Sequence, residues 1–217
     1  MNPAAPPHLQ DEIARTISRE DMAKLPIRRY EGRVCVVATS QDLEEARSDF
    51  REESVVGLDT ETRPAFKKGE VHLPCLVQVA AARAVYLFQL RRTEVFPVLA
   101  ELLSDPRIVK AGVSLKDDIR ALKQVFAFEE KNLLDLGTAA RAGGSGQTGV
   151  RNLAGILLGF RIPKGAQTSN WAARELSAKQ IAYAATDAWI CRELYLRFKS
   201  LGLLRSPLPE SGAAAGA

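Results

Sequence analysis

Cysteine and histidine are scarce in this sequence, and their scarcity argues against several classes of site. The 217 residues include three widely spaced cysteines and two histidines, His8 and His72. Without a Cys-x-x-Cys pair or a histidine cluster, a Cys/His zinc site is not expected. A sparse, odd cysteine count is typical of a reducing compartment. We therefore expect a cytoplasmic protein.

Long apolar runs and a large excess of one charge are also missing. No apolar stretch approaches the ~18 residues of a membrane-spanning helix, and residues 1–10 have no apolar signal core, so no membrane partner is expected. The net charge is +4, which is too small in itself to indicate an anionic partner. Hydrophobic residues make up 46% and charged residues 26% of the chain, which excludes a wholly disordered or fibrous protein.

Between two proline-containing tails the chain alternates strand-like and helix-like patterns. Residues 1–10 and 206–217 contain three and two prolines and little to bury, so both tails are expected to be disordered. The patterns predict strands at Val34–Ala38, Ser54–Asp59, Leu76–Ala80, Ala84–Phe88 and Ile108–Val113, with a short strand or turn at Leu133–Leu136. They predict helices at 40–52 (Ser40 being the N-cap), Val95–Leu103, Leu115–Phe126, 150–158 and 177–200. This order predicts an α/β domain with a mixed sheet.

Two carboxylates stand at the end of one predicted strand. Asp59 and Glu61 are two residues apart, so both side chains point to the same side of the strand. Neighbouring carboxylates are costly unless a cation lies between them, and Mg²⁺ and Mn²⁺ prefer carboxylate oxygens. The pair therefore indicates a metal site, with solvated charges at a strand end as the alternative.

Further acidic groups occur on two predicted helices. Asp117 and Asp118 open the helix at Leu115–Phe126, where acidic residues also serve the helix dipole. Tyr183 and Asp187 are four residues apart on one helix face. A tyrosine hydroxyl beside a carboxylate can orient a water, although an ordinary surface contact is the alternative.

Together these segments resemble the DEDD family of 3′–5′ exonucleases, in its tyrosine-bearing branch, which includes ribonuclease D and the exonuclease domain of the Werner syndrome helicase. The matching segments are VVGLDTETRP (55–64), VKAGVSLKDDIRAL (109–122) and YAATDA (183–188). The run SNWAARELSAKQIAYAATDA (169–188) and the Thr-Arg-Pro after Glu61 favour the Werner-like subgroup over ribonuclease D itself.

The resemblance implies a ribonuclease H-like α/β fold, with a mixed central sheet flanked by helices. This exonuclease domain would span residues 29–204, with residues 1–28 as an N-terminal extension and 205–217 as a disordered tail. It also implies two-metal-ion hydrolysis of a nucleic acid, DNA or RNA, from a free 3′ end, releasing nucleoside 5′-monophosphates without an organic cofactor. Tyr183 would position the attacking water, and two Mg²⁺ or Mn²⁺ ions would bind to Asp59, Glu61, Asp118 and Asp187. If the helix begins one residue differently, Asp117 exchanges roles with Asp118.

The substrate contacts are predicted from charge and position. Residues 141–179 contain six basic residues and one acidic residue, whereas the other 178 residues contain 24 basic and 25 acidic ones. A basic, glycine-rich segment before the third motif favours phosphate binding, although a solvated surface is the alternative. Aromatic rings can stack on bases, although a large aromatic such as Trp171 also packs well in a core. The predicted substrate-binding residues are Thr62, Phe66, Lys67, Lys164, Trp171 and Arg174.

Two competing functions can be weighed at this point. A haloacid-dehalogenase-type phosphatase also places an aspartate at a strand end, but it needs a second aspartate where this chain has Glu61, and it leaves Tyr183 and Asp187 unexplained. A non-catalytic nucleic-acid-binding module on the same scaffold is the other alternative. The presence of every expected acidic group argues against it.

Overall fold

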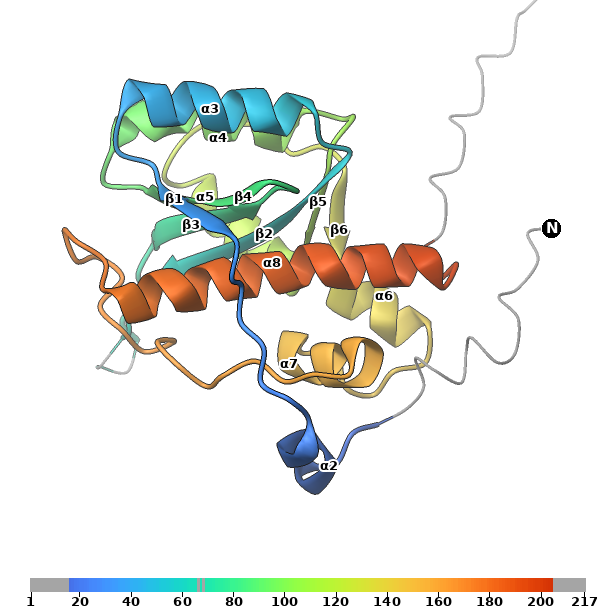
Figure 1. Ribbon diagram of the computed structural model, residues 1–217. Coiled ribbons are helices and arrows are strands. Elements are labelled where there is room, and N and C mark those ends of the chain that lie inside the picture. Colours follow the sequence, from blue (N-terminus) through green and yellow to red (C-terminus); the bar gives the residue numbers. More distant parts are fainter. Residues whose placement is uncertain (1–15, 66, 68, 205–217) are drawn as a thin grey trace, which may run out of the picture.

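A six-stranded mixed sheet forms the centre of the computed structural model, which describes residues 16–65, 67 and 69–204 (Figure 1). The predictions for the two terminal tails concern residues outside this part. The strand order is β1-β4-β3-β2-β5-β6. The pairs β1–β4, β2–β5 and β5–β6 are parallel. Strand β3 is antiparallel to both of its neighbours, β2 and β4. The strands are β1 Arg33–Val36, β2 Val55–Thr62, β3 Pro74–Ala80, β4 Ala84–Gln89, β5 Val109–Gly112 and β6 Leu133–Asp135.

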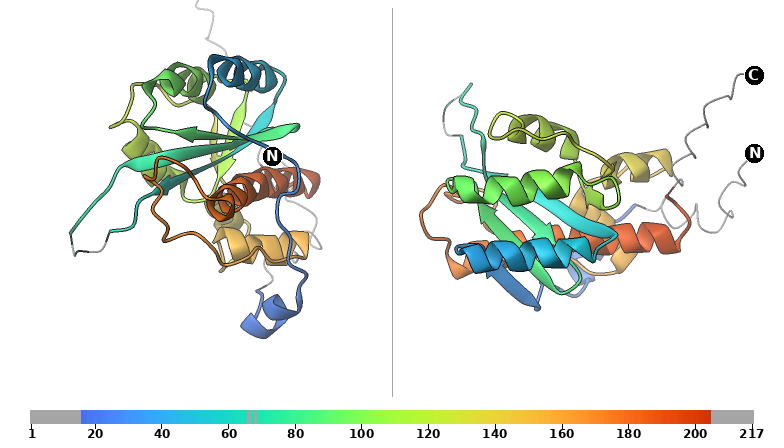
Figure 2. Two further views of the ribbon diagram at one scale, coloured as in Figure 1. Left: turned by 60° about the vertical axis from the view of Figure 1, so that its left-hand side comes forward. Right: turned by 90° about the horizontal axis from the view of Figure 1, so that it is seen from above.

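Helices cover both faces of the sheet, which confirms the predicted mixed α/β fold. In Figure 1, α3 and α4 lie above the sheet and the long helix α8 runs below it, and Figure 2 shows the same layers from two further directions. The described helices are α2 Arg19–Lys24, α3 Ser40–Arg51, α4 Phe96–Ser104 (preceded by the 3₁₀ turn η1, Thr93–Val95), α5 Leu115–Leu122, α6 Leu136–Ala142, α7 Val150–Leu153, which continues as the π-helical turn η2 Ala154–Leu158, and α8 Ala178–Ser200. Among the described residues, no helix is both long and apolar enough to cross a membrane.

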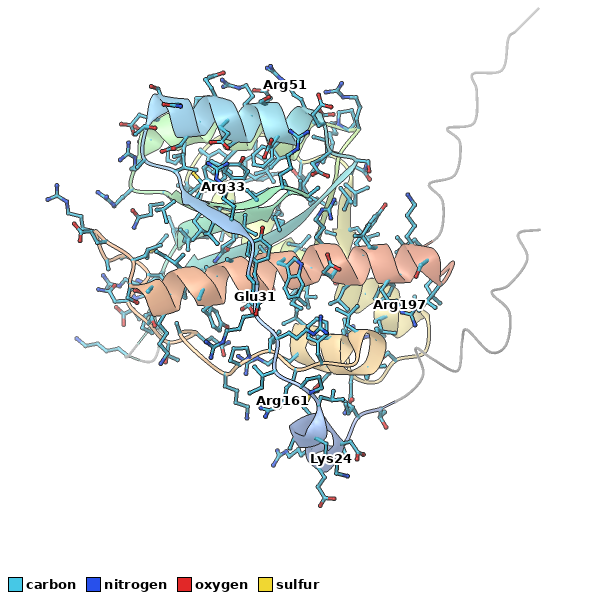
Figure 3. The ribbon with its side chains drawn as sticks, in the orientation of Figure 1. Lys24, Glu31, Arg33, Arg51, Arg161 and Arg197 are labelled. Atoms are coloured by element: carbon cyan, nitrogen blue, oxygen red, sulfur yellow. The ribbon has the colours of Figure 1, made fainter. Side chains whose placement is uncertain are left out.

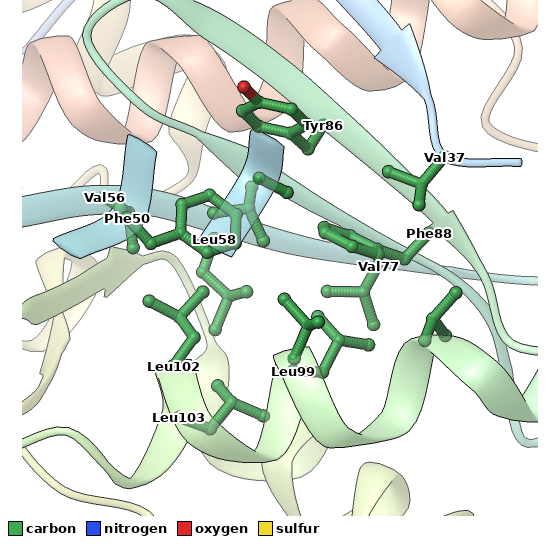
Figure 4. Close-up of a cluster of buried hydrophobic side chains, with 14 of the residues drawn as sticks. Val37, Phe50, Val56, Leu58, Val77, Tyr86, Phe88, Leu99, Leu102 and Leu103 are labelled. Carbon is green, nitrogen blue, oxygen red and sulfur yellow. The ribbon is translucent and has the colours of Figure 1, made fainter. Parts of the chain in front are cut away.

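The alternation of side chains along β2 decides what each face of the sheet carries. Val56 and Leu58 point into the core under α3 and α4. Figure 4 shows this core, which includes Phe50, Val77, Tyr86, Phe88, Leu99, Leu102 and Leu103. The alternate residues of β2, beginning with Val55 and Gly57, point to the other face of the sheet, towards α8. The same alternation therefore directs Asp59 and Glu61 towards α8.

Close packing between α8 and the sheet depends on small residues from both layers. A Cβ atom on Gly57 would lie 2.0 Å from the carbonyl oxygen of Ala188. Ala184 and Ala185 of the same helix are fully buried, next to residues of β3 and β4. The helix begins at a capping box formed by Ser177 and Gln180. This arrangement brings the backbone of α8 directly over β2.

Residues 17–28 form an N-terminal segment that packs against the region of α7, far away in the sequence. The backbone N–H and C=O of Ile17 both bind the side-chain amide of Gln147, at 2.9 and 3.2 Å. The N–H of Arg161 donates to the carbonyl of Pro26, and the N–H of Arg28 donates to the carbonyl of Arg161. Figure 3 shows Arg161 between α7 and α2. The described part of the segment predicted as an extension therefore contacts the domain near both of its ends.

Three local details differ from the predictions. Thr39, not Ser40, caps α3, because its hydroxyl accepts the N–H of Asp42 in a capping box. Helix α5 ends at Leu122, and the following turns bring Phe126 against Phe96, with the ring centroids 5.0 Å apart. Helices α2 and α6 were not predicted, because six and seven residues are too few to show a helical hydrophobic period.

Candidate active site

Three carboxylates from two elements converge beside β2. Asp59 and Glu61 come from β2, and Asp187 comes from the facing side of α8. One carboxylate oxygen of each residue lies within 4.8 Å of the others. Glu61 and Asp187 are each only 8% exposed. The i, i+2 spacing on the strand and the close approach of α8 together build this cluster.

The cluster lies in the wall of a cavity of about 470 Å³. Strand β2, the start of α7 and the middle of α8 supply most of the lining. The cavity thus gives the carboxylates access to a ligand of substantial size. Its lining residues are Asp59, Thr60, Glu61, Val113, Gly149, Val150, Arg151, Asn152, Gln167, Tyr183, Asp187 and Cys191.

Asp118 lies next to this cluster and accepts a hydrogen bond from a residue of β2. The hydroxyl of Thr60, whose side chain points to the opposite side of β2 from its two acidic neighbours, donates to Asp118 Oδ1 at 2.9 Å. The residue before α5, Ser114, has a left-handed φ of 63° and no capping side-chain bond. The Leu115 N–H instead donates to Asp135 Oδ2 at 2.9 Å, which anchors the start of the helix.

The two neighbouring aspartates of α5 point in different directions. Asp117 is exposed and pairs with Arg120, one turn along the helix. Asp118 is half-buried and faces Thr60. Of the two residues left open by the sequence, Asp118 is the one whose charge acts on Asp59 and Glu61, but it belongs neither to the three converging carboxylates nor to the cavity lining.

Burial raises the pKa values of the clustered carboxyls, and mutual repulsion adds to this effect at Asp59 and Glu61. Burial, followed by the charges of Asp59, Asp187 and Asp118, raises the pKa of Glu61 to about 9. Burial and the charges of Asp187 and Asp118 also raise the pKa of Asp59. Burial raises the pKa values of Asp118 and Asp187 to about 6. A set of buried oxygen donors that resists carrying its own negative charge is a good fit for a hard divalent cation.

Tyr183 lies one helical turn before Asp187 and is bonded to it. Its hydroxyl donates a hydrogen bond to the carboxylate, which lowers the pKa of Asp187 against the effect of burial. Burial raises the pKa of Tyr183 above its usual value. A Cβ atom on Gly165 would lie 2.8 Å from the Tyr183 ring, and the ring of Trp171 lies at 6.0 Å between centroids. The loop before α8 thus fixes the direction of the hydroxyl.

The predicted substrate-binding residues that the structure describes lie outside the lining of the cavity that contains the carboxylates. The side chains of Thr62, Lys67, Lys164 and Arg174 are exposed, and none of the four lines the cavity. Phe66 lies outside the described residues.

Trp171 is only 1% exposed, and its indole N–H donates to the carbonyl of Gln167. Its ring is enclosed by the core under α8. No face is left for a base, so the predicted stacking role of Trp171 is wrong and the packing alternative is correct.

Arg151 is the main cavity residue that was not singled out from the sequence. It projects from the start of α7, and its charge lowers the pKa of Asp187. The basic composition of residues 141–179 was the available signal, but it did not separate Arg151 from Arg161, which instead binds the carbonyl of Leu25. That distinction depends on the tertiary path of the chain.

Comparisons with known proteins agree with this geometry. A family model described as 3′–5′ exonuclease matches residues 34–202. Ribonuclease D of Gluconacetobacter diazotrophicus is 34% identical over 164 residues, which cover 74% of this chain and 41% of that protein. The bifunctional 3′–5′ exonuclease/ATP-dependent helicase WRN of Mus musculus is 30% identical over 169 residues, which cover 75% of this chain and 12% of that protein. The preference for a Werner-like subgroup stays a prediction, because both kinds of relative match.

A solved structure supports the fold independently. The EXO domain of Nibbler from Aedes aegypti superposes with a TM-score of 0.70 at 23% identity, covering 81% of this chain and 91% of that one. The chain spans about two fifths of the length of the curated ribonuclease D relatives that it matches. The order of the three motifs, the mixed sheet and the family match lead to one conclusion: the chain belongs to the DEDD family of 3′–5′ exonucleases.

Proposed function

We propose that this protein is a metal-dependent exonuclease that hydrolyses nucleic-acid phosphodiesters from the 3′ end and releases nucleoside 5′-monophosphates. The observation that carries the proposal is the convergence of Asp59, Glu61 and Asp187 within 4.8 Å in the wall of an open cavity. A buried carboxylate cluster alone repels a phosphodiester. With cations bound, the same cluster attracts one.

The donor set suits two divalent cations, Mg²⁺ or Mn²⁺. Asp59, Glu61 and Asp187 offer converging oxygens, and Asp118 adds a fourth carboxylate beside them. Bound there, such ions would supply a water of lowered pKa and neutralisation of the charge on the leaving oxygen. The protein's part is to hold the carboxylates in place, which the packing of α8 on β2 achieves.

Tyr183 would orient the attacking water rather than remove its proton. Its raised pKa keeps the hydroxyl protonated at neutral pH. The O–H already donates to Asp187, which leaves the oxygen lone pairs free to accept a hydrogen bond from water. The contacts with Gly165 and Trp171 keep the ring in one orientation.

Arg151 would bind a phosphate of the substrate. It lines the same cavity as the carboxylates and projects from α7, on a different element from all of them. A guanidinium suits this task because its planar N–H groups match phosphate oxygens. Thr62 remains a proposed contact of the substrate's 3′ end, and Phe66, Lys67, Lys164 and Arg174 remain proposed contacts with the rest of the nucleic acid.

A digestion assay tests the proposed function. A 5′-labelled oligonucleotide, as matched DNA and RNA, is incubated with Mg²⁺ or Mn²⁺ and wild type, Asp59→Asn, Asp187→Asn or Asp117→Asn. We expect a ladder of shortened products from wild type and from Asp117→Asn, whose side chain is exposed and away from the cluster. The other two variants should yield none.

The same assay separates catalysis from simple binding. A protein that binds the oligonucleotide but yields no shortened product with either metal would be a non-catalytic binding module. A ladder that persists in Asp59→Asn and Asp187→Asn would assign the activity to another site or to a contaminant. The comparison of DNA with RNA identifies the substrate class.

A further inference from the structure

One buried side chain beside the carboxylates has no hydrogen-bond partner. Gln78, in the middle of β3, is 0% exposed. Neither its amide nitrogen nor its amide oxygen is bonded to any described residue. Leaving both ends of a buried amide unpaired is costly, and most buried polar groups in proteins have partners. The Gln78 amide therefore has hydrogen-bonding capacity that no described residue satisfies.

The strand register places Gln78 directly opposite Asp59. The two residues are Cα partners in the antiparallel pair β2–β3, so their side chains share one face of the sheet, with Cβ atoms about 4.5–5.5 Å apart. On the other side, the partner of Gln78 on β4 is the apolar Leu87. The buried alanines of α8 pack against this part of the sheet. Among the Cα partners of Gln78, Asp59 is thus the one that carries a hydrogen-bonding side chain.

We propose that Gln78 is a positioning residue: when a divalent cation is bound, its Nε2–H donates to the Asp59 carboxylate and holds that carboxylate in the orientation for binding the cation. The inference rests on the proposed function, and it names a residue that acts through Asp59, one of the proposed metal ligands. Hydrogen bonds from such residues set the direction of ligand oxygens and strengthen metal affinity. An amide suits the position because it donates a hydrogen bond without adding a further negative charge to the cluster.

A second glutamine on the same face shows what an ordinary structural role looks like. Gln89 lies on β4, opposite Leu76, and is 6% exposed. Its Nε2 donates to the carbonyl of Ala173 at 3.0 Å. Its amide nitrogen has a local partner, and its Cα partner on β3 is an apolar residue rather than an acidic one. It is therefore a matched control for Gln78.

Calorimetric titration with Mn²⁺ tests the assignment on the full chain. Gln78→Met keeps the length of the side chain and removes the donor, so we expect the Mn²⁺ dissociation constant to rise about 10- to 100-fold. Gln89→Met should bind Mn²⁺ like wild type. In digestion assays, Gln78→Met should lose kcat at limiting Mn²⁺ and regain it at high Mn²⁺, with an unchanged KM for the oligonucleotide.

The possible outcomes are distinct. Wild-type Mn²⁺ affinity in a folded Gln78→Met variant overturns the positioning role and leaves the proposed function intact. Failure of wild type itself to bind Mn²⁺ overturns both.

A measurement on the wild type covers the case in which the variant does not fold. With ¹⁵N-labelled glutamine, Mg²⁺ should shift the side-chain amide signal of Gln78 and leave that of Gln89 in place. An unmoved Gln78 signal under saturating Mg²⁺ also overturns the proposal.

Discussion

Replacing Gly57 with alanine should separate the two halves of the carboxylate cluster. The added Cβ would lie 2.0 Å from the Ala188 carbonyl oxygen and 2.7 Å from the Arg192 nitrogen. Both are backbone atoms of α8, so no flexible side chain can move aside. To restore an ordinary contact of 3.4 Å, the helix must move away from β2 by about 1.4 Å. Asp187 precedes Ala188 and must move with it.

The consequences for stability and activity can be estimated separately. Overpacking of this kind costs about 1–3 kcal/mol. For a domain of this size each kcal/mol lowers the melting temperature by about 2–4 °C. A displacement of about 1 Å between reacting groups costs on the order of 10²-fold in rate. We therefore expect activity to fall far more than stability.

Gly146→Ala is the matched control, because a Cβ atom there meets nothing within 4 Å. Melting temperature and Mn²⁺-dependent digestion are measured for wild type and both variants. Gly146→Ala should resemble wild type in both. A Gly57→Ala protein with wild-type melting temperature and wild-type activity would refute the argument that this contact sets the geometry of the site.

Three further predictions concern individual groups in the cavity. Tyr183→Phe keeps the ring but removes the hydroxyl, so Mn²⁺ binding by calorimetry should persist while kcat falls by about 10²-fold; unchanged kcat would exclude the water-orienting role. Arg151→Gln should raise the KM for oligonucleotide and flatten its dependence on salt, and Arg151→Lys should largely restore both; an unaltered salt dependence would contradict phosphate binding. The pKa of Glu61 is raised to about 9 and that of Asp187 to about 6. The folded metal-free protein therefore retains protons that the unfolded chain releases. Its melting temperature should fall as the pH rises from about 4 to 9. Saturating Mn²⁺ should remove this decline, and a metal-free melting temperature that rises over the same range would show that the pKa shifts have the opposite sign.

The parts of the site that follow from local periodicity could be predicted from the sequence. The i, i+2 spacing of Asp59 and Glu61 on a strand places both on one face. The i, i+4 spacing of Tyr183 and Asp187 on a helix does the same. Each relation needs only the correct type of element. The strands and most of the helices were predictable for the same reason.

Relations between elements could not be predicted in this way. The orientation of Asp118 depends on the left-handed turn at Ser114 and on the Asp135 carboxylate that binds the Leu115 N–H. The burial of Trp171 depends on how the loop before α8 returns to the sheet. Gln78 resembled an ordinary strand residue until the register of β3 against β2 placed it opposite Asp59. These features depend on pairing and packing between distant segments.

The N-terminal segment has a consequence for how the enzyme loses activity on heating. The described hydrogen bonds between residues 17–28 and the chain around α7 connect Ile17 with Gln147, and Leu25, Pro26 and Arg28 with Arg161. Surface contacts of this kind open at free energies well below that of global unfolding. Arg151 lies between Gln147 and Arg161 in the sequence. When the hydrogen bonds at these two residues break, the part of the cavity wall that contains Arg151 becomes more mobile. Thermal inactivation should therefore precede the melting of the α8–sheet core.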